Sequence, residues 1–433
     1  MAAGNSRERY ADLLEDARSR THALVEQVSE DDMNRVHDPL MSPLVWDLGH
    51  IAAFEDLWLC QRGAGLRPLR SDLARVYDAE ETPRADRGEL PYLRLGDALE
   101  FMAAVRARAL EVLETAAFDQ PADVLNHGGF VWDMLVQHEH QHNETMLQTL
   151  KLAPAGTYAP ARRETPGDPA AARLDGDLTK VTGGIVPIGD DGLRFAYDNE
   201  RPRHAVELDE FEIDVLPVTN GRFSEFVADG GYARREWWSE EGWAWRSAEG
   251  VERPLFWSED GTERSFEREA ALDPSLPVIH VSWFEADAFA RSRGLRLPTE
   301  REWECAASWD PELQNKRRFP WGDSDPTIEQ ANLDQLGFGP APAGAFSAGA
   351  APCGALGMIG DVWEWTASHF DGYPGFGAHP YPEYSEVFFG GAYRVLRGGS
   401  WATRPAVIRN SFRNWDHPYR RQIHAGFRCA RSR

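Results

Sequence analysis

Val395-Leu396-Arg397-Gly398-Gly399-Ser400-Trp401 is the stretch that decides the fold of the second half of this chain. Its apolar start and its two glycines fit a strand that ends in a tight turn, because glycine adopts the backbone angles that such turns need. Upstream, Gly360-Asp361-Val362-Trp363-Glu364-Trp365 fits a buried aromatic core. We therefore expect a domain that contains β-structure around both segments, with most of these residues serving as scaffold.

The sequence on either side of these segments consists of short β-like runs and turns. Two helical stretches interrupt them, Asn220 to Ala228 and Phe284 to Arg293, and Asn220 and Ser282 are candidate caps. The β-like runs are Val181 to Ile188, His204 to Leu208 and Val395 to Trp401. We expect an irregular α+β domain, rich in loops and in tryptophan, over residues 181–433.

The first 152 residues have helical spacing instead. Four helices are expected, at residues 10–25, 42–58, 101–113 and 131–150. Ser42-Pro43 fits an N-cap and a first-turn proline for the second of them. Four helices within about 150 residues indicate a helix bundle. Residues 153–180 are rich in proline, alanine, glycine and aspartate, which predicts a linker.

The composition restricts the partners. The chain has 46 Lys and Arg against 70 Asp and Glu, a formal charge of −24, which argues against nucleic acids and anionic membranes. No long apolar span is present, and the polar start does not resemble a signal peptide. Four cysteines, Cys60, Cys305, Cys353 and Cys429, show no CxxC spacing, so we expect a reduced, cytoplasmic setting.

The strongest chemical signal is His138-Glu139-His140-Gln141-His142-Asn143-Glu144. Helix positions four apart differ by about 40° in azimuth, so His138 and His142 project together and could hold one ion. His140 lies about 200° from His138 and cannot join them, and Glu144 is similarly displaced from His142. The alternative is a solvated polar helix face that contains histidines.

His50 is a third candidate ligand, in the mostly apolar stretch Val45 to Ile51. A lone histidine on an apolar helix is more often a core residue, but facing helices of a bundle can supply inward ligands to one metal. Three neutral imidazoles leave open coordination positions, which suits Zn(II) for Lewis-acid chemistry or Fe(II) for O2 chemistry. Spacing alone does not separate these two metals.

An ordered series of motifs in residues 181–433 resembles the formylglycine-generating-enzyme-like domain, a variant of the C-type lectin fold. Besides the two segments quoted above, the series contains Val218-Thr219-Asn220, His280-Val281-Ser282-Trp283, Arg296 to Glu304, Pro320-Trp321-Gly322 and Gly426-Phe427-Arg428. A true formylglycine-generating enzyme needs a cysteine pair soon after its Gly-Gly-Ser segment. Here Ser400 is followed by no cysteine before Cys429, so that activity is disfavoured.

The N-terminal helices resemble the DinB-like four-helix domain, and His138-x3-His142-x-Glu144 is similar to its metal motif. The two domains in this order resemble the ergothioneine-biosynthesis sulfoxide synthases, the EgtB family, with the sharpest local match from Ser411 to Gln422. The resemblance implies an O2-dependent, non-haem iron(II) enzyme. It would join γ-glutamylcysteine to hercynine, which is Nα-trimethylhistidine, and give hercynyl-γ-glutamylcysteine sulfoxide. Residues 1–152 would supply metal ligands, and residues 181–433 the substrate-binding and catalytic loop.

The resemblance also implies which residues act on the metal and on oxygen. His50, His138 and His142 would hold Fe(II) and leave positions open for substrates. Tyr381 is similar in position to the family's catalytic tyrosine, which would supply a proton or a hydrogen atom. Tyr373 and Tyr384 are the alternatives for that role, and a tyrosine of the aromatic core is another interpretation.

For the substrates, the resemblance implies that Arg84 and Arg87 bind the carboxylates of γ-glutamylcysteine, since guanidinium forks suit that task. Asp416 would pair with the ammonium group of the same thiol, and Arg420 with a carboxylate. The residues expected around hercynine are Gln141, Tyr384, Asn414 and Trp415, and an aromatic face suits its quaternary ammonium group.

Other functions stay open at this point. A selenoneine-type synthase would use a selenosugar on a similar scaffold, and free cysteine could replace γ-glutamylcysteine. A zinc-dependent thiol transferase on the DinB-like helices would not need O2. A non-catalytic lectin-like binding protein would hold no metal at the three histidines.

Overall fold

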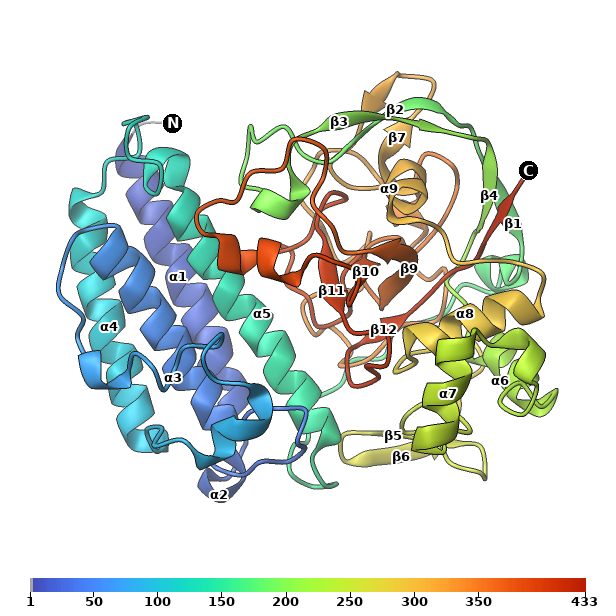
Figure 1. Cartoon of the computed structure of the whole chain (residues 1–433), viewed down its shortest axis with the longest axis horizontal. Coiled ribbons are helices and arrows are strands. Elements are labelled where there is room, and N and C mark those ends of the chain that lie inside the picture. The colour runs from blue at the N-terminus through green and yellow to red at the C-terminus, as the bar shows by residue number, and fades with distance from the viewer. Residues whose placement is uncertain (1–2) are drawn as a thin grey trace. The chain divides into compact units, whose positions relative to one another are not determined.

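The structure is a computed structural model that describes residues 3–433, with side chains from residue 6 onward. The chain divides into two compact units, Met1–Ala159 and Pro160–Arg433, whose elements are labelled in Figure 1. Within the described residues, no helix combines the length and the apolar character that crossing a membrane requires.

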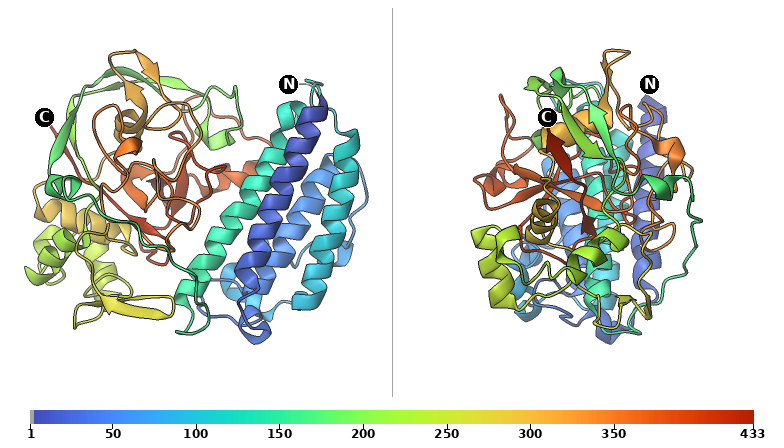
Figure 2. Two further views of the ribbon diagram at one scale, coloured as in Figure 1. Left: turned by 180° about the vertical axis from the view of Figure 1, so that it is seen from behind. Right: turned by 90° about the vertical axis from the view of Figure 1, so that its right-hand side faces the viewer.

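Four long helices dominate the first unit and run side by side (Figures 1 and 2). They are α1 (Ala3–Val25), α3 (Leu44–Glu55), α4 (Leu95–Thr115) and α5 (Phe130–Leu152). Helix α1 packs on α5, and α3 packs on both α4 and α5. The four helices predicted from apolar spacing are therefore confirmed. The shorter elements are α2 (Glu30–Met33), the π-helix η1 (Asp56–Arg62) and the 3-10 turns η2 (Ser71–Leu73), η3 (Arg84–Glu89) and η4 (His127–Gly129).

The predicted start of α3 is wrong in one respect. Pro43 is itself the N-cap, and no side chain caps the helix. The hydroxyl of Ser42 instead accepts a hydrogen bond from Nη1 of Arg87 at 2.9 Å. Arg87 is buried, and a buried cation without acceptors is costly, so the serine is used there rather than at the helix end.

A buried network of two arginines and two glutamates ties the four long helices together. Arg18 of α1 and Arg106 of α4 each contact both Glu55 of α3 and Glu139 of α5, at 2.7–3.1 Å. Charged groups persist in a protein interior when they are paired and hydrogen-bonded. Because Glu139 directly follows His138, this network holds α5 in register at the predicted metal motif.

Small sheets, short helices and long loops make up the second unit. Its four-stranded sheet has the order β11-β10-β9-β12, in which β12 runs parallel to β9 and the other pairs are antiparallel. Leu396 pairs with Trp365 on one side of β10, and Val395 pairs with Trp415 on the other. The strands are β9 (Trp363–His369), β10 (Arg394–Arg397), β11 (Asn414–Asp416) and β12 (Ala425–Gly426).

The remaining strands form one three-stranded sheet and three hairpins. The sheet β1-β4-β13 joins β1 (Leu178–Val181), β4 (Phe211–Asp214) and β13 (Ala430–Ser432). The hairpins pair β2 (Gly184–Ile188) with β3 (His204–Leu208), β5 (Thr262–Ser265) with β6 (Arg268–Ala271), and β7 (Trp309–Asp310) with β8 (Asn315–Lys316).

Four α-helices and six 3-10 turns complete the described part of this unit. The helices are α6 (Asn220–Ala228), α7 (Glu240–Glu249), α8 (Trp283–Ser292) and α9 (Glu300–Ser308). The turns are η5 (Ala171–Leu174), η6 (Asp198–Glu200), η7 (Arg235–Trp237), η8 (Ser347–Gly349), η9 (Pro382–Tyr384) and η10 (Glu386–Phe388).

The strands, helices and helix caps of this unit agree in part with those predicted from the sequence. Strand β3 and helix α6 have the predicted bounds, and Ser282 caps α8 as expected. The run from 181 to 188 is wrong as a single strand, because a break separates β1 from β2. The cap of α6 is Thr219, whose side chain accepts a hydrogen bond from the backbone of Arg222, and not Asn220. Helices α7 and α9 were not predicted.

The two segments that decided the expected fold behave as predicted. Gly398 has φ of +93°, and a Cβ there would lie 2.6 Å from the carbonyl oxygen of Met358, so the tight turn requires glycine. Trp363 and Trp365 are both buried. Arg397 is completely buried and donates to Glu304 at 2.5 Å, which anchors β10 to α9.

Candidate metal centre and substrate-binding residues

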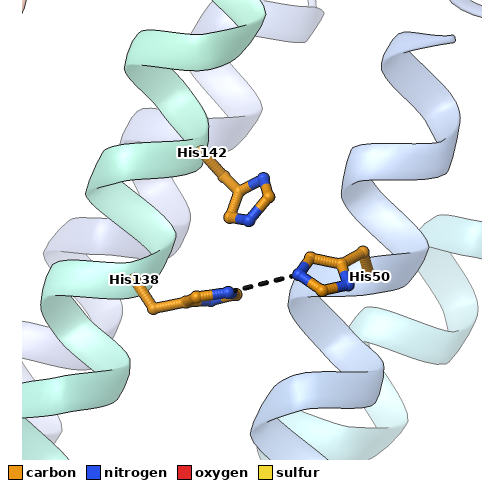
Figure 3. Close-up of side chains that lie close together, drawn as sticks. All are labelled: His50, His138 and His142. Carbon is orange, nitrogen blue, oxygen red and sulfur yellow. Dashed lines mark hydrogen bonds between the residues drawn. The ribbon is translucent and has the colours of Figure 1, made fainter. Parts of the chain in front are cut away.

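Three imidazole rings meet in the first unit (Figure 3). His138 and His142 lie one turn apart on α5, and His50 faces them from α3. One ring nitrogen from each lies within 4.8 Å of the other two. Nε2 of His50 is 3.3 Å from Nε2 of His138. The structure thus brings together the three residues that the sequence proposes as ligands.

Hydrogen bonds orient two of these rings. Nδ1 of His50 donates to the carbonyl oxygen of Tyr77 at 2.7 Å, and Nδ1 of His142 donates to Oδ1 of Asp47 at 3.0 Å. With the Nδ1 protons placed there, the Nε2 atoms of both neutral rings carry lone pairs. A metal-binding histidine commonly has its other ring nitrogen bonded to a carbonyl or carboxylate in this way. The donor set therefore fits a metal ion.

Electrostatics favour the neutral, ligating form of the rings. Burial and, next, the neighbouring His142 lower the pKa of His50 well below its usual value. The same two causes act, in the same order, on the pKa of His138. Neutral imidazole is the form that binds metals, so both rings are ready to act as ligands at neutral pH.

Aromatic packing holds the rings in place. Trp46 stacks on His50 at a centroid distance of 4.9 Å, and Phe54 stacks on His138 at 3.9 Å. Gly49 lets Tyr77 approach, because a Cβ at that position would lie 2.1 Å from the tyrosine ring. Since the group found among the described residues contains three protein ligands, a bound metal would keep positions for substrates.

His140 and Glu144 lie apart from this cluster, as the helical spacing predicts. His140 is buried, and its Nε2 lies 3.9 Å from Oδ2 of Asp16 on α1. Glu144 is also buried, and it does not belong to the metal-binding group found among the described residues. The central histidine of the motif therefore faces α1 while its neighbours face α3.

Arg87 lies close to the histidine cluster and is held by neutral groups. Its guanidinium donates to the carbonyl oxygens of Thr82 and Ala79, and its carbon lies 3.8 Å from the centroid of the Trp46 ring. Burial and then the adjacent charge of Arg84 lower the pKa of Arg87 to about 10. The charge of Asp47 acts in the opposite direction on the pKa of Arg87, but it is the smallest of the three effects. Two adjacent guanidinium groups suit an anionic ligand.

The other two predicted residues of this unit lie on η3 and on α5. Arg84 is exposed and donates to the sulfur of Met41 at 3.7 Å. Gln141 is half-buried on α5, directly before His142.

The predicted residues of the second unit gather at the end of its four-stranded sheet. Asn414, Trp415 and Asp416 form β11. Tyr384 lies with its ring centroid 6.1 Å from that of Tyr381 and 6.3 Å from that of Trp415. The structure therefore places both loop tyrosines near the strand that carries the other substrate candidates.

Two further contacts define the polar side of this cluster. Asp416 accepts a hydrogen bond from the backbone of His417 at 2.8 Å, and its Oδ1 lies 3.7 Å from Nε of Arg420. The Nε and Nη1 atoms of Arg420 are buried and have no hydrogen-bond partner within the described chain. Tyr373, one of the two alternatives to Tyr381, is buried, and its hydroxyl donates weakly to Glu300 at 3.5 Å.

Sequence reasoning missed the groups that orient the histidines. Asp47 precedes His50 by three positions and so shares its helix face, which is a signal that could have been read. Tyr77 acts through its carbonyl oxygen, which has no signature in the sequence.

Two different protein families match the two units of this chain. Residues 13–146 match the DinB superfamily, and residues 166–433 match the sulfatase-modifying factor enzyme 1-like domain. The formylglycine-generating enzyme of Streptomyces coelicolor is 31% identical and aligns with 63% of this chain and 94% of its own.

Two hercynine oxygenases align over almost the entire chain. The protein from Mycolicibacterium thermoresistibile is 47% identical over 98% of this chain and 95% of its own length. The protein from Mycolicibacterium smegmatis is 46% identical over 98% and 99%. With its DinB-type helical unit followed by a sulfatase-modifying-factor-type unit, this chain belongs to the hercynine oxygenase family.

Proposed function

We propose that this chain is an oxidoreductase that uses O2 to join the sulfur of γ-glutamylcysteine to the imidazole of hercynine, giving hercynyl-γ-glutamylcysteine sulfoxide for ergothioneine biosynthesis. The observation that carries the proposal is the cluster of His50, His138 and His142 in a chain that is 47% identical to a hercynine oxygenase over nearly its whole length.

The overall reaction balances without another reductant. One S–H bond and one imidazole C–H bond are lost, and one C–S bond and one S–O bond form. The electrons released by these changes reduce O2, whose atoms end in the sulfoxide and in one water molecule. Hercynine, γ-glutamylcysteine and O2 are therefore sufficient co-substrates.

We assign Fe(II) to the three histidines. Zinc would accept the same imidazoles, but it has no redox chemistry and could not take part in the reduction of O2. Iron would supply that redox chemistry and would lower the pKa of a bound thiol. The carbonyl oxygen of Tyr77 orients the ring of His50, and Asp47 orients the ring of His142, without help from a metal.

Arg84 and Arg87 are proposed to bind the carboxylates of γ-glutamylcysteine. Burial and the adjacent charge of Arg84 lower the pKa of Arg87 by more than Asp47 raises it, so an anion would be favourable there. Asp416 would pair with the ammonium group of the thiol, and Arg420 with a carboxylate. Nη1 of Arg420 is a buried donor without a hydrogen-bond acceptor in the described chain, and a substrate carboxylate would supply one.

Hercynine carries a trimethylammonium group, which cannot donate a hydrogen bond and is best held by aromatic faces. Tyr384 and Trp415 supply such faces, and their ring planes are almost perpendicular, at 86°. Asn414 and Gln141 would bind the polar groups of the same substrate. Holding the imidazole beside the thiol supplies the advantage of proximity.

Tyr381 is proposed as the catalytic residue that supplies a proton or a hydrogen atom while O2 is reduced. Its phenol suits this role because it can donate either one from the same Oη atom. Its place at the N-cap of the turn Pro382–Tyr384 is next to the aromatic residues assigned to hercynine.

Each of the two units is also assigned to a fold. The four long helices are assigned to a DinB-like four-helix bundle over residues 1–152, and residues 181–433 to a C-type-lectin-like domain, joined by a linker at 153–180. A cytoplasmic location belongs to the proposal as well, since the four cysteines are free thiols.

An assay with the iron-loaded protein, hercynine and γ-glutamylcysteine tests the function. We expect a product with the mass of the sulfoxide in air and none without O2. Parallel reactions with cysteine and with a selenosugar identify the donor. Thiol consumption with zinc and without O2, and with no sulfoxide formed in air, would favour a thiol transferase, and absence of metal binding would favour a lectin-like binding protein.

A further inference from the structure

The loop that carries Tyr381 has little regular structure of its own. It connects the end of β9 at His369 to the start of β10 at Arg394 and contains only the two short turns η9 and η10. From residue 374 to residue 394, every side chain is exposed or half-buried except that of Ser385, which is completely buried. Ser385 is therefore the one side chain of residues 374–394 that is inserted into the interior.

The hydroxyl of Ser385 is bonded on both sides. It donates to Oδ1 of Asp198 at 2.5 Å and accepts from Nδ2 of Asn199 at 3.0 Å. The second carboxylate oxygen of Asp198 accepts from the backbone nitrogen of His379 at 3.1 Å. Asp198 and Asn199 are each 1% exposed. One buried carboxylate thus holds the loop at two points that flank Tyr381.

The segment that supplies this carboxylate is rigidly held. Glu200 accepts hydrogen bonds from Arg409 and, at 2.8 Å, from Ser411. The carbonyl oxygen of Asn199 accepts from Nη1 of Arg413 at 2.7 Å. Residues 409–413 lead directly into β11, so the segment is fixed to the strand that carries Asn414, Trp415 and Asp416.

Aromatic stacking adds a third connection between the segment and the loop. Tyr197 lies face to face with Tyr384, at a centroid distance of 4.4 Å and an interplanar angle of 11°. The segment from Tyr197 to Glu200 therefore contacts both the loop that carries Tyr381 and residues 409–413, which precede β11. The local sequence around Asp198 or around Ser385 does not predict the hydrogen bond between them, since the two residues are 187 positions apart.

We propose that Asp198 and Ser385 are positioning residues that form a latch, and that this latch holds Tyr381 and Tyr384 at the distance from Trp415 that sulfoxide formation needs. The effect of the latch on sulfoxide formation rests on the proposed function, whereas the contacts that form the latch do not. Hydrogen bonds to a charged group are strong enough that losing one would raise the open fraction of the loop by on the order of ten- to a hundredfold. A displacement of about 1 Å is enough to impair a positioned catalytic group severely.

The test uses the full-length, iron-loaded protein and the variants Ser385→Ala and Asp198→Asn. Ser347→Ala is the matched control, because it makes the same change at an exposed serine. The first readout is the rate of limited proteolysis within residues 374–393, which requires no assumption about the reaction. The second is the ratio of sulfoxide to simple thiol oxidation products at equal thiol consumption, which does not depend on how much of the variant is folded.

We expect both latch variants to be cleaved at least about tenfold faster in the loop, and to shift the product ratio towards thiol oxidation, while Ser347→Ala changes neither. Unchanged cleavage would overturn the latch. Faster cleavage with an unchanged product ratio would overturn its positioning role. If the parent protein forms no sulfoxide, the proposed function fails, and the proteolysis result still decides whether the latch exists. If Asp198→Asn does not fold, Ser385→Ala alone carries both readouts.

Discussion

Asp47 and His142 lie on different helices, and Oδ1 of Asp47 accepts the Nδ1 proton of His142 at 3.0 Å. The same aspartate is buried on α3, three positions before His50, so the helix that supplies one of the histidines also supplies the carboxylate that orients another. Its function follows from this arrangement: it fixes the tautomer in which Nε2 of His142 is free to bind a metal.

Replacing this carboxylate is expected to weaken metal binding. We predict that Asp47→Ala lowers the affinity for Fe(II) by roughly 10- to 100-fold, because the ring of His142 loses the group that orients it. Competition with a chelator measures the effect. Asp31→Asn, at an exposed aspartate of α2, serves as the control. An affinity for Asp47→Ala equal to that of the control would show that the hydrogen bond does not support metal binding.

The histidines of the α5 motif are expected to differ in their effect on metal content. His138→Ala should lose the metal, because two imidazoles remain and the site was built for three. His140→Ala should keep it, although removal of a buried ring lowers stability, because His140 faces Asp16. Elemental analysis of the purified variants checks this. Equal loss in both would mean that the metal lies elsewhere.

The role of Tyr381 can be read from the products. We predict that Tyr381→Phe redirects the reaction from the sulfoxide towards simple thiol oxidation, because the phenolic hydroxyl is removed while the ring stays. Tyr373→Phe is the matched control at a buried tyrosine that points to Glu300. Product masses at equal O2 consumption give the answer. If the sulfoxide yield fell only in the Tyr373 variant, the catalytic assignment would have to move to that residue.

Much of the first unit was predictable because its information is local. The apolar residues of α1, α3, α4 and α5 recur with helical spacing, and this spacing sets the buried face. The same periodicity separated His140 from His138 and His142. The partner of the latter pair, His50, was harder to assign, because helix spacing does not reveal which helices face each other.

The second unit was less predictable because its contacts are not local. Helix α9 does have a local signal, a reciprocal capping box between Thr299 and Glu302, which sequence reasoning could have used. No comparable signal exists for the contact between Asp198 and Ser385, which depends on how two distant loops fold. Polar groups whose partners are distant in the sequence are therefore the part of the site that only a structure supplies.

The buried ion network should be the most sensitive point of the first unit. We predict that Arg106→Leu lowers the free energy of unfolding by about 3–5 kcal/mol, because Glu55 and Glu139 keep their charges and lose one of two cations. Arg9→Leu is the control, since Arg9 pairs with Asp133 at the surface and such pairs contribute about 0–1 kcal/mol. Denaturant unfolding followed by the helical circular dichroism signal measures both. A loss below about 1 kcal/mol for Arg106→Leu would mean that the helices are held by apolar packing alone.

Acid should destabilise the second unit through Glu304. Burial alone would raise the pKa of this carboxyl group, but the charges of Lys316 and Arg397 outweigh it and lower the pKa to about 2. A carboxylate whose pKa is lower in the folded state stabilises the fold above its unfolded pKa of about 4.3 and loses that contribution as the pH falls. The loss should therefore occur between about pH 4.3 and pH 2 and amount to on the order of 3 kcal/mol.

Unfolding temperatures measured across this range test the assignment to Glu304. The variant Glu304→Gln cannot titrate, so it should be less stable than the parent at pH 6 and should show a shallower decline below pH 4. Glu269→Gln, at an exposed glutamate of β6, should follow the parent curve. If the Glu304 variant declined as steeply as the parent, the acid sensitivity would have to come from other buried carboxylates, such as Glu139, whose pKa is also lowered, by Arg18 and Arg106 against the opposing effect of burial.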